Sequence, residues 1–206
     1  MSNKAFTMFL ELLKSAFPKY EKLPTSNHGA KKIVKELGLH YEIIDVCKND
    51  CVIYWGNLKD AIVCPTCKLS RWKPQRTRKT KNGEEAKKVP WKVLQYFPIT
   101  PRLQRLFMSS KTASDMVWHF KDRVKDGVLR HPADAEAWKA FDQLHPTFSK
   151  EHRNVRLGLA ADGFNPFGNL NLSHSTWPVM VFPFNIPPWL CMKESYMFLC
   201  LLITWT

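Results

Sequence analysis

Two stripes of apolar residues predict a pair of helices at the start of the chain. The first stripe has the i, i+3, i+4, i+7 spacing of one helix face and consists of Phe6, Phe9, Leu10 and Leu13. Its helix is expected to end before Pro18. A second helix with the same periodicity is expected to begin after Ser26, with Gly38 as its C-terminal cap. We interpret these helices, over residues 1–38, as a structural brace.

Caps and prolines predict three further helices in the middle of the chain. The expected helix starts are Thr100-Pro101, a capping box of Thr112 and Asp115, and Pro132. The third of these helices is expected to end at Pro146. His119 and His131 are interpreted as helix-end or packing residues. Residues 100–150 are therefore interpreted as a helical segment.

Apolar runs predict strands in the last part of the chain. Val155, Leu157 and Leu159 alternate with polar or small residues up to the Asp162-Gly163 turn. Two β-prone runs follow, WPVMVFPF at residues 177–184 and WLCMKESYMFLCLLI at 189–203. We expect an antiparallel meander of three strands, which needs helices to cover its faces. The predicted fold class is α+β, with a further extended segment at residues 89–99.

The charge of the chain points to an anionic partner. Its 206 residues contain 31 Lys and Arg against 18 Asp and Glu, a net charge of +13. This favours nucleic acid over an acidic membrane surface. The longest apolar run, residues 196–203, is far shorter than the ~20 residues of a membrane helix. No secretory signal is recognised at the N-terminus, so we expect a soluble intracellular protein without membrane association.

Two close cysteine pairs predict a metal site. Cys47 and Cys51 have the spacing C-x3-C, twelve residues follow, and Cys64 and Cys67 have the spacing C-x2-C. Two such turns can place four thiolates around one Zn2+, and four sulfurs leave no open position for a catalytic water. The alternatives are two disulfides or unrelated buried thiols. We predict a structural, zinc-ribbon-like module over residues 39–73.

A basic tract follows the second cysteine pair. Residues 68–92 hold ten basic side chains against only Glu84 and Glu85. Nine are predicted to contact nucleic acid: Lys68, Arg71, Lys73, Arg76, Arg78, Lys79, Lys81, Lys87 and Lys88. The alternatives for the tract are a solvated, flexible linker and a nuclear-localisation signal. Residues 74–99 are interpreted as a basic linker and extended segment. Trp72 and Trp91 are expected to pack on the metal module rather than to stack on bases.

Several long segments together resemble a known family. They are DVCKNDCVIYW with CPTCKLSRW, VPWKVLQYFPITPRLQRLF, DGVLRHPADAEAWKAFD, and NVRLGLAADGFNPFGN with STWPVMVFPFNIPPWLCMK. These segments are similar to the transposases of En/Spm-type (CACTA) DNA transposons, almost continuously from about residue 23 to residue 203. The resemblance implies a cut-and-paste transposase with a zinc-binding N-terminal region and a catalytic domain of ribonuclease-H-like fold. It also implies DNA as substrate and a nuclear location.

The resemblance assigns one catalytic position. Such domains hold two Mg2+ ions with three acidic side chains, and the first of these acids corresponds to Asp162 in LAADGF. From the residues alone, Asp162-Gly163 is equally a turn former. Glu194 is the only acidic residue that follows Asp162, and it does not match a catalytic acid of the family. Residues 151–206 are therefore expected to be the truncated start of the catalytic domain, with Asp162 vestigial and strand transfer absent.

Two functions remain as hypotheses. The first is a transposase-family fragment that binds zinc and DNA and associates with a full-length transposase. The second is a zinc-braced protein-interaction module in which the basic tract serves only for nuclear import.

Overall fold

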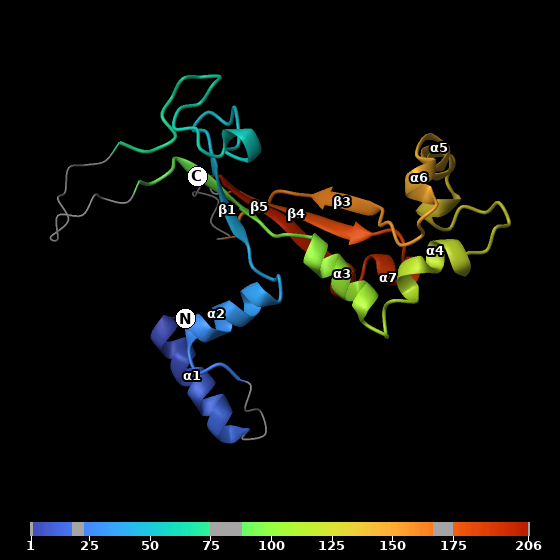
Figure 1. The fold of residues 1–206 in the computed structure, drawn as a ribbon, viewed down its shortest axis with the longest axis horizontal. Coiled ribbons are helices and arrows are strands. Elements are labelled where there is room, and N and C mark those ends of the chain that lie inside the picture. The colour runs from blue at the N-terminus through green and yellow to red at the C-terminus, as the bar shows by residue number, and fades with distance from the viewer. Residues whose placement is uncertain (1, 18–22, 75–87, 167–174, 206) are drawn as a thin grey trace.

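The centre of the molecule is one antiparallel sheet of five strands. The computed structural model describes residues 2–17, 23–74, 88–166 and 175–205. The strands are β1 (Glu42–Val46), β2 (Lys92–Tyr96), β3 (Leu157–Ala161), β4 (Ser175–Pro183) and β5 (Phe198–Trp205). Their order in the sheet is β1-β2-β5-β4-β3, so the last strand lies in the middle (Figure 1). The expected α+β class and the expected β3-β4-β5 meander are both confirmed.

Strand pairing runs between segments that are far apart in the sequence. Leu94 of β2 pairs with Ile44 on one side and with Ile203 of β5 on the other. Neighbouring strands place paired residues on the same face of a sheet, and Ile44 and Leu94 are both buried on that face. Strands β1 and β2, on either side of the cysteine module, therefore share one sheet with the last strand, β5. The sequence pattern assigns these three strands to different segments.

Strand β4 contains Pro178 at a position where the regular ladder with β3 has stopped. Pro178 pairs with Leu202 of β5, while the β3 ladder ends at the Ala161–Val179 pair. A proline lacks the N–H that a ladder needs, so it is tolerated where a strand has lost one partner. Beyond Asp162-Gly163 the pairing with β4 resumes at Phe164 and Thr176, so Pro178 faces a short interruption of this ladder.

The N-terminal helices form as expected. Helix α1 is Asn3–Ala16 and helix α2 is Asn27–Glu36, each with a serine side chain that accepts a backbone N–H at its N-terminus. Gly38 follows α2 with φ +62°, and a Cβ there would lie 2.5 Å from Pro101 Cβ. Both the turn and the close approach to the next helix therefore require glycine. The pair projects away from the sheet (Figure 1).

The middle helices are shorter than the sequence predicts. Helix α3 is Thr100–Met108, α4 is Trp118–Lys121, α5 is Glu136–Leu144 and α6 is Pro146–Ser149; short 3-10 turns are η1 (Gly56–Leu58), η2 (Asp115–Val117) and η3 (Pro132–Asp134). The predicted capping box of Thr112 is wrong, because its hydroxyl donates to the Leu106 carbonyl at 2.6 Å. Pro146 does follow the end of α5, and it also begins α6, since proline fits the first turn of a helix.

The last apolar run is only partly a strand. Residues 189–203 were predicted to be extended, but α7 (Pro188–Cys191) and η4 (Glu194–Tyr196) precede β5, which begins at Phe198. Proline at the first position favours the α7 turn. Cys191 and Tyr196 then turn inward onto Ile186 and Met116, both fully buried. This packing overrides the β propensity of the segment.

Candidate metal centre and nucleic-acid interface

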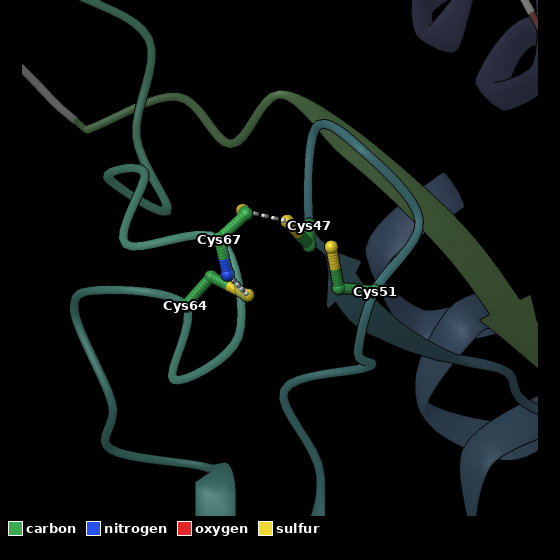
Figure 2. Close-up of side chains that lie close together, drawn as sticks. All are labelled: Cys47, Cys51, Cys64 and Cys67. Atoms are coloured by element: carbon green, nitrogen blue, oxygen red, sulfur yellow. Dashed lines mark hydrogen bonds between the residues drawn. The ribbon is translucent and has the colours of Figure 1, made fainter.

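Two tight hairpins carry the four cysteines. In the first, Cys47 N–H donates to the Val52 carbonyl at 3.0 Å and Asp50 has φ +58°. In the second, Cys64 N–H donates to the Leu69 carbonyl at 2.9 Å and Lys68 has φ +60°. The left-handed residue in each hairpin reverses the chain next to a cysteine. Both hairpins therefore direct their sulfurs into one space (Figure 2).

The four sulfurs fit a tetrahedral ion. All four Sγ atoms lie within 4.8 Å of one another, and Cys47 Sγ and Cys67 Sγ are 3.4 Å apart. Zn–S bonds of about 2.3 Å at tetrahedral angles require sulfurs about 3.8 Å apart. All four thiols are free, so the disulfide alternative is not realised here. The predicted cluster is confirmed as a group that could hold a metal such as zinc.

Burial makes four negatively charged thiolates unfavourable unless a cation lies between them. Cys47 and Cys64 are 1 % and 0 % exposed, beside buried Tyr54. Burial raises the pKa of Cys47, and desolvation together with neighbouring thiols raises the pKa of Cys51 to about 12. The Cys67 N–H, which donates to Cys64 Sγ, lowers the pKa of Cys64 to about 6. The site therefore favours a mixed protonation state by itself, and a divalent cation would stabilise four thiolates.

Arg71 connects the metal hairpins to the sheet. Its guanidinium forms a two-nitrogen contact with Asp45 of β1, at 2.7 Å from each nitrogen. Nη1 also donates to the Lys59 and Ala61 carbonyls at 2.6 and 3.2 Å. The same group lies 4.7 Å over the Tyr54 ring. These contacts favour a structural role for Arg71, although its position in the basic tract predicted nucleic-acid contact.

The two ends of the basic tract lie together beside the module. Lys73 N–H donates to the Val89 carbonyl at 2.8 Å, and Trp72 bridges to Pro90. Lys68, Lys73 and Lys88 are exposed. The other predicted contacts lie outside the described residues: Arg76, Arg78, Lys79, Lys81 and Lys87.

The tryptophans beside the tract contact cations of the protein itself. Lys48 Nζ lies 4.3 Å over the Trp91 ring, and the Arg71 guanidinium lies 4.6 Å from the Trp72 ring. Lys92 Nζ pairs with Asp50 at 2.6 Å. These contacts agree with the expected packing of both rings on the module. They also show that part of the local positive charge is used internally.

Asp162 stands at the end of β3. It is exposed, and its Oδ1 accepts the Gly163 N–H at 2.8 Å, as in a turn. Within the described part of the chain, the four cysteines form the one group of acidic, His or Cys residues that could hold a metal. Neither Asp162 nor Glu194 therefore belongs to a group of three or more potential metal ligands in the described residues.

The partner of Arg71, Asp45, and the strand that carries it were not predicted from the sequence. Asp45 lies two residues before Cys47, but a lone acidic residue in an apolar run gives no signal of its distant partner. The β1 strand itself, EIIDV, is short and was included in the metal module.

Comparison with known proteins connects the second half of the chain to transposition. Residues 126–206 match the sequence model of the transposase family tnp2, which is less than half of the chain. Among curated proteins and among solved structures, none matches. The match supports a transposase-related protein. In the described residues, no helix is long and apolar enough to span a membrane.

Proposed function

We propose that this chain is the zinc-braced, DNA-binding part of a transposase of the En/Spm (CACTA) type. The observation that carries the proposal is the match of residues 126–206 to the transposase family tnp2. The four-cysteine cluster lies ahead of that match and supplies a rigid platform beside a basic tract. Zinc is the proposed ion because thiolate ligands in tetrahedral array suit it.

The proposed DNA contacts are the exposed basic side chains of the tract and those that lie outside the described residues. Lys68, Lys73 and Lys88 are exposed around the ends of the tract, next to the cysteine hairpins. Together with the five basic residues between Lys73 and Lys88, they form a concentrated source of positive charge. If six phosphates are neutralised, DNA affinity falls by roughly a thousandfold between low and moderate salt. A fluorescence-anisotropy salt titration with duplex DNA tests this; a flat salt dependence would contradict it.

For the matched region we propose the start of a ribonuclease-H-like domain. The antiparallel β3-β4-β5 meander with Asp162 at the end of its first strand supports this proposal. Asp162 is proposed as the first of the acidic residues that hold Mg2+ in the family. Because Asp162 belongs to no group of three or more potential metal ligands in the described residues, the 206-residue polypeptide is proposed to lack strand transfer by itself. Mg2+-dependent nicking that disappears in Asp162→Ala would refute that statement.

A protein-interaction module is the second candidate function. Apolar side chains are exposed on the cysteine module: Ile53, Trp55, Ile62, Val63 and Leu69. They favour a protein-interaction module, in which the basic tract directs nuclear import. Such a module would bind duplex DNA weakly at every salt concentration, so the same titration separates the two functions. For both, we propose a nuclear location, and for the transposase function we propose association with a full-length transposase.

A further inference from the structure

Helices α4, α5 and α6 lie at the opposite end of the molecule from the cysteine module (Figure 1), and a second cluster of cationic side chains lies among them. A cavity of about 290 Å³ lies between α4, α5, α6 and the approach to β3. Its lining includes His119, Arg123, Lys125, Lys139, His152 and Arg156. Asp142 is the single carboxylate among the lining residues.

Part of this positive charge is compensated from outside the cavity. Arg123 pairs with Asp134 and Lys139 pairs with Glu136, and neither carboxylate lines the cavity. Arg156 pairs with Asp142. These pairs hold the cations in place while their carboxylates, Asp142 apart, stay away from the cavity.

One buried donor at the cavity has no acceptor, and two further cationic or imidazole groups have no hydrogen-bond partner among the described residues. Arg156 Nη1 is buried and makes no hydrogen bond, although the side chain is fixed 3.8 Å over the Trp138 ring. Lys125 is exposed and takes part in none of the ion pairs of the described residues; its Nζ is 5.9 Å from the centre of the Phe120 ring. The His152 ring is held by stacking on Phe120 at 3.3 Å, with no hydrogen bond to a described residue. A buried donor without a partner is unfavourable, so an acceptor brought by a ligand would be stabilised here.

The electrostatics of His119 agree with an excess of positive charge. Burial and, to a smaller extent, the nearby Arg156, His131 and His152 lower the pKa of His119 to about 4, against the opposing effect of the contact with the Asn185 carbonyl. A bound anion would oppose these cationic neighbours and raise that pKa.

We propose that this cavity is an anion site that binds one phosphate group. A volume near 290 Å³ is at the lower end of the range of ligand sites, about 300–1,000 Å³, which suits one phosphate rather than a whole nucleotide. Guanidinium, ammonium and imidazole donors around one space are the groups that bind phosphate oxygens. The phosphate comes either from a nucleic-acid backbone or from a free phosphate ion.

The test uses the zinc-loaded 206-residue protein and inorganic phosphate. Phosphate is titrated against chloride at constant ionic strength while the histidine ring signals are followed by NMR. We expect saturable shifts of His119 and His152 and a raised pKa of His119. The double variant Lys125→Gln/His152→Gln, both in side chains outside the buried core, should weaken phosphate binding about tenfold. Lys111→Gln removes an exposed charge outside the cavity and should leave binding unchanged.

A competing single-stranded oligonucleotide identifies the source of the phosphate. Displacement of phosphate assigns the cavity to the nucleic-acid backbone, and phosphate binding without displacement assigns it to a free phosphate; both support the site. Histidine shifts that do not saturate, or equal phosphate affinity in the double variant and in Lys111→Gln, would overturn the proposal. Because the readout is phosphate binding, the site can fail while DNA binding at the basic tract stands.

Discussion

The ion pair of Arg71 and Asp45 offers a sharp test of how the cysteine module is attached to the sheet. Their side chains are only 15 % and 12 % exposed, so the pair is largely desolvated. Replacing Arg71 by Met keeps the aliphatic stem but leaves the Asp45 carboxylate and two backbone carbonyls without their donor. Breaking a buried pair in this way destabilises a protein by about 3–5 kcal/mol. We therefore expect Arg71→Met to lose an amount in that range.

The assay is urea unfolding of the zinc-loaded protein, followed by tryptophan fluorescence. Arg71→Lys is the matched control for charge, because it keeps a cation but loses the two-nitrogen contact. Its unfolding free energy should therefore still fall by most of the amount expected for Arg71→Met. The double variant Arg71→Met/Asp45→Asn should recover part of the loss, because no unpaired charge remains buried. If instead Arg71→Met unfolds like the parent and loses DNA affinity, Arg71 is a phosphate contact and our structural interpretation is wrong.

Three further predictions follow from buried groups. Cys64→Ser should lose the metal and unfold the hairpins, because metal binding and folding are coupled; zinc content and circular dichroism measure this. Gly158→Ala should destabilise the protein by about 1–3 kcal/mol in urea unfolding, since the added Cβ would clash with the Phe182 ring, and a parent-like midpoint would contradict it. The folded-state pKa of His119 is about 4, below its ordinary 6.5, so the neutral form is favoured in the folded protein. The contribution of neutral His119 to the free energy of unfolding is present above pH 6.5. It is lost as the pH falls toward 4, by about 1–2 kcal/mol after allowance for partial exposure. A flatter dependence of the unfolding free energy on pH in His119→Asn checks this.

Local signals in the sequence were sufficient for the N-terminal helices and the cysteine cluster. Ser26 and Gly38 mark the two ends of α2 through their own backbone preferences, which depend little on the rest of the chain. The cysteine spacing likewise restricts each pair to a tight turn. The structure brings the two turns together as expected, with all four sulfurs within 4.8 Å of one another.

Long-range packing decided the features that the sequence could not predict. The capping-box pattern at Thr112 fails because the Leu106 carbonyl competes for the hydroxyl. The run at residues 189–203 folds partly into helical turns because Cys191 and Tyr196 are needed in the core around Ile186. The pairing of β2 with β5 joins residues more than a hundred positions apart, and no local pattern reports such a contact.

The central claim is that one zinc ion, bound by Cys47, Cys51, Cys64 and Cys67, organises the cysteine hairpins beside the proposed DNA-binding tract. Elemental analysis of the purified polypeptide, combined with duplex-DNA binding before and after chelation, tests it most directly. We predict stoichiometric zinc, with loss of both the metal and the DNA affinity on chelation. A folded protein that contains no stoichiometric zinc and binds DNA equally well in chelator would contradict the account.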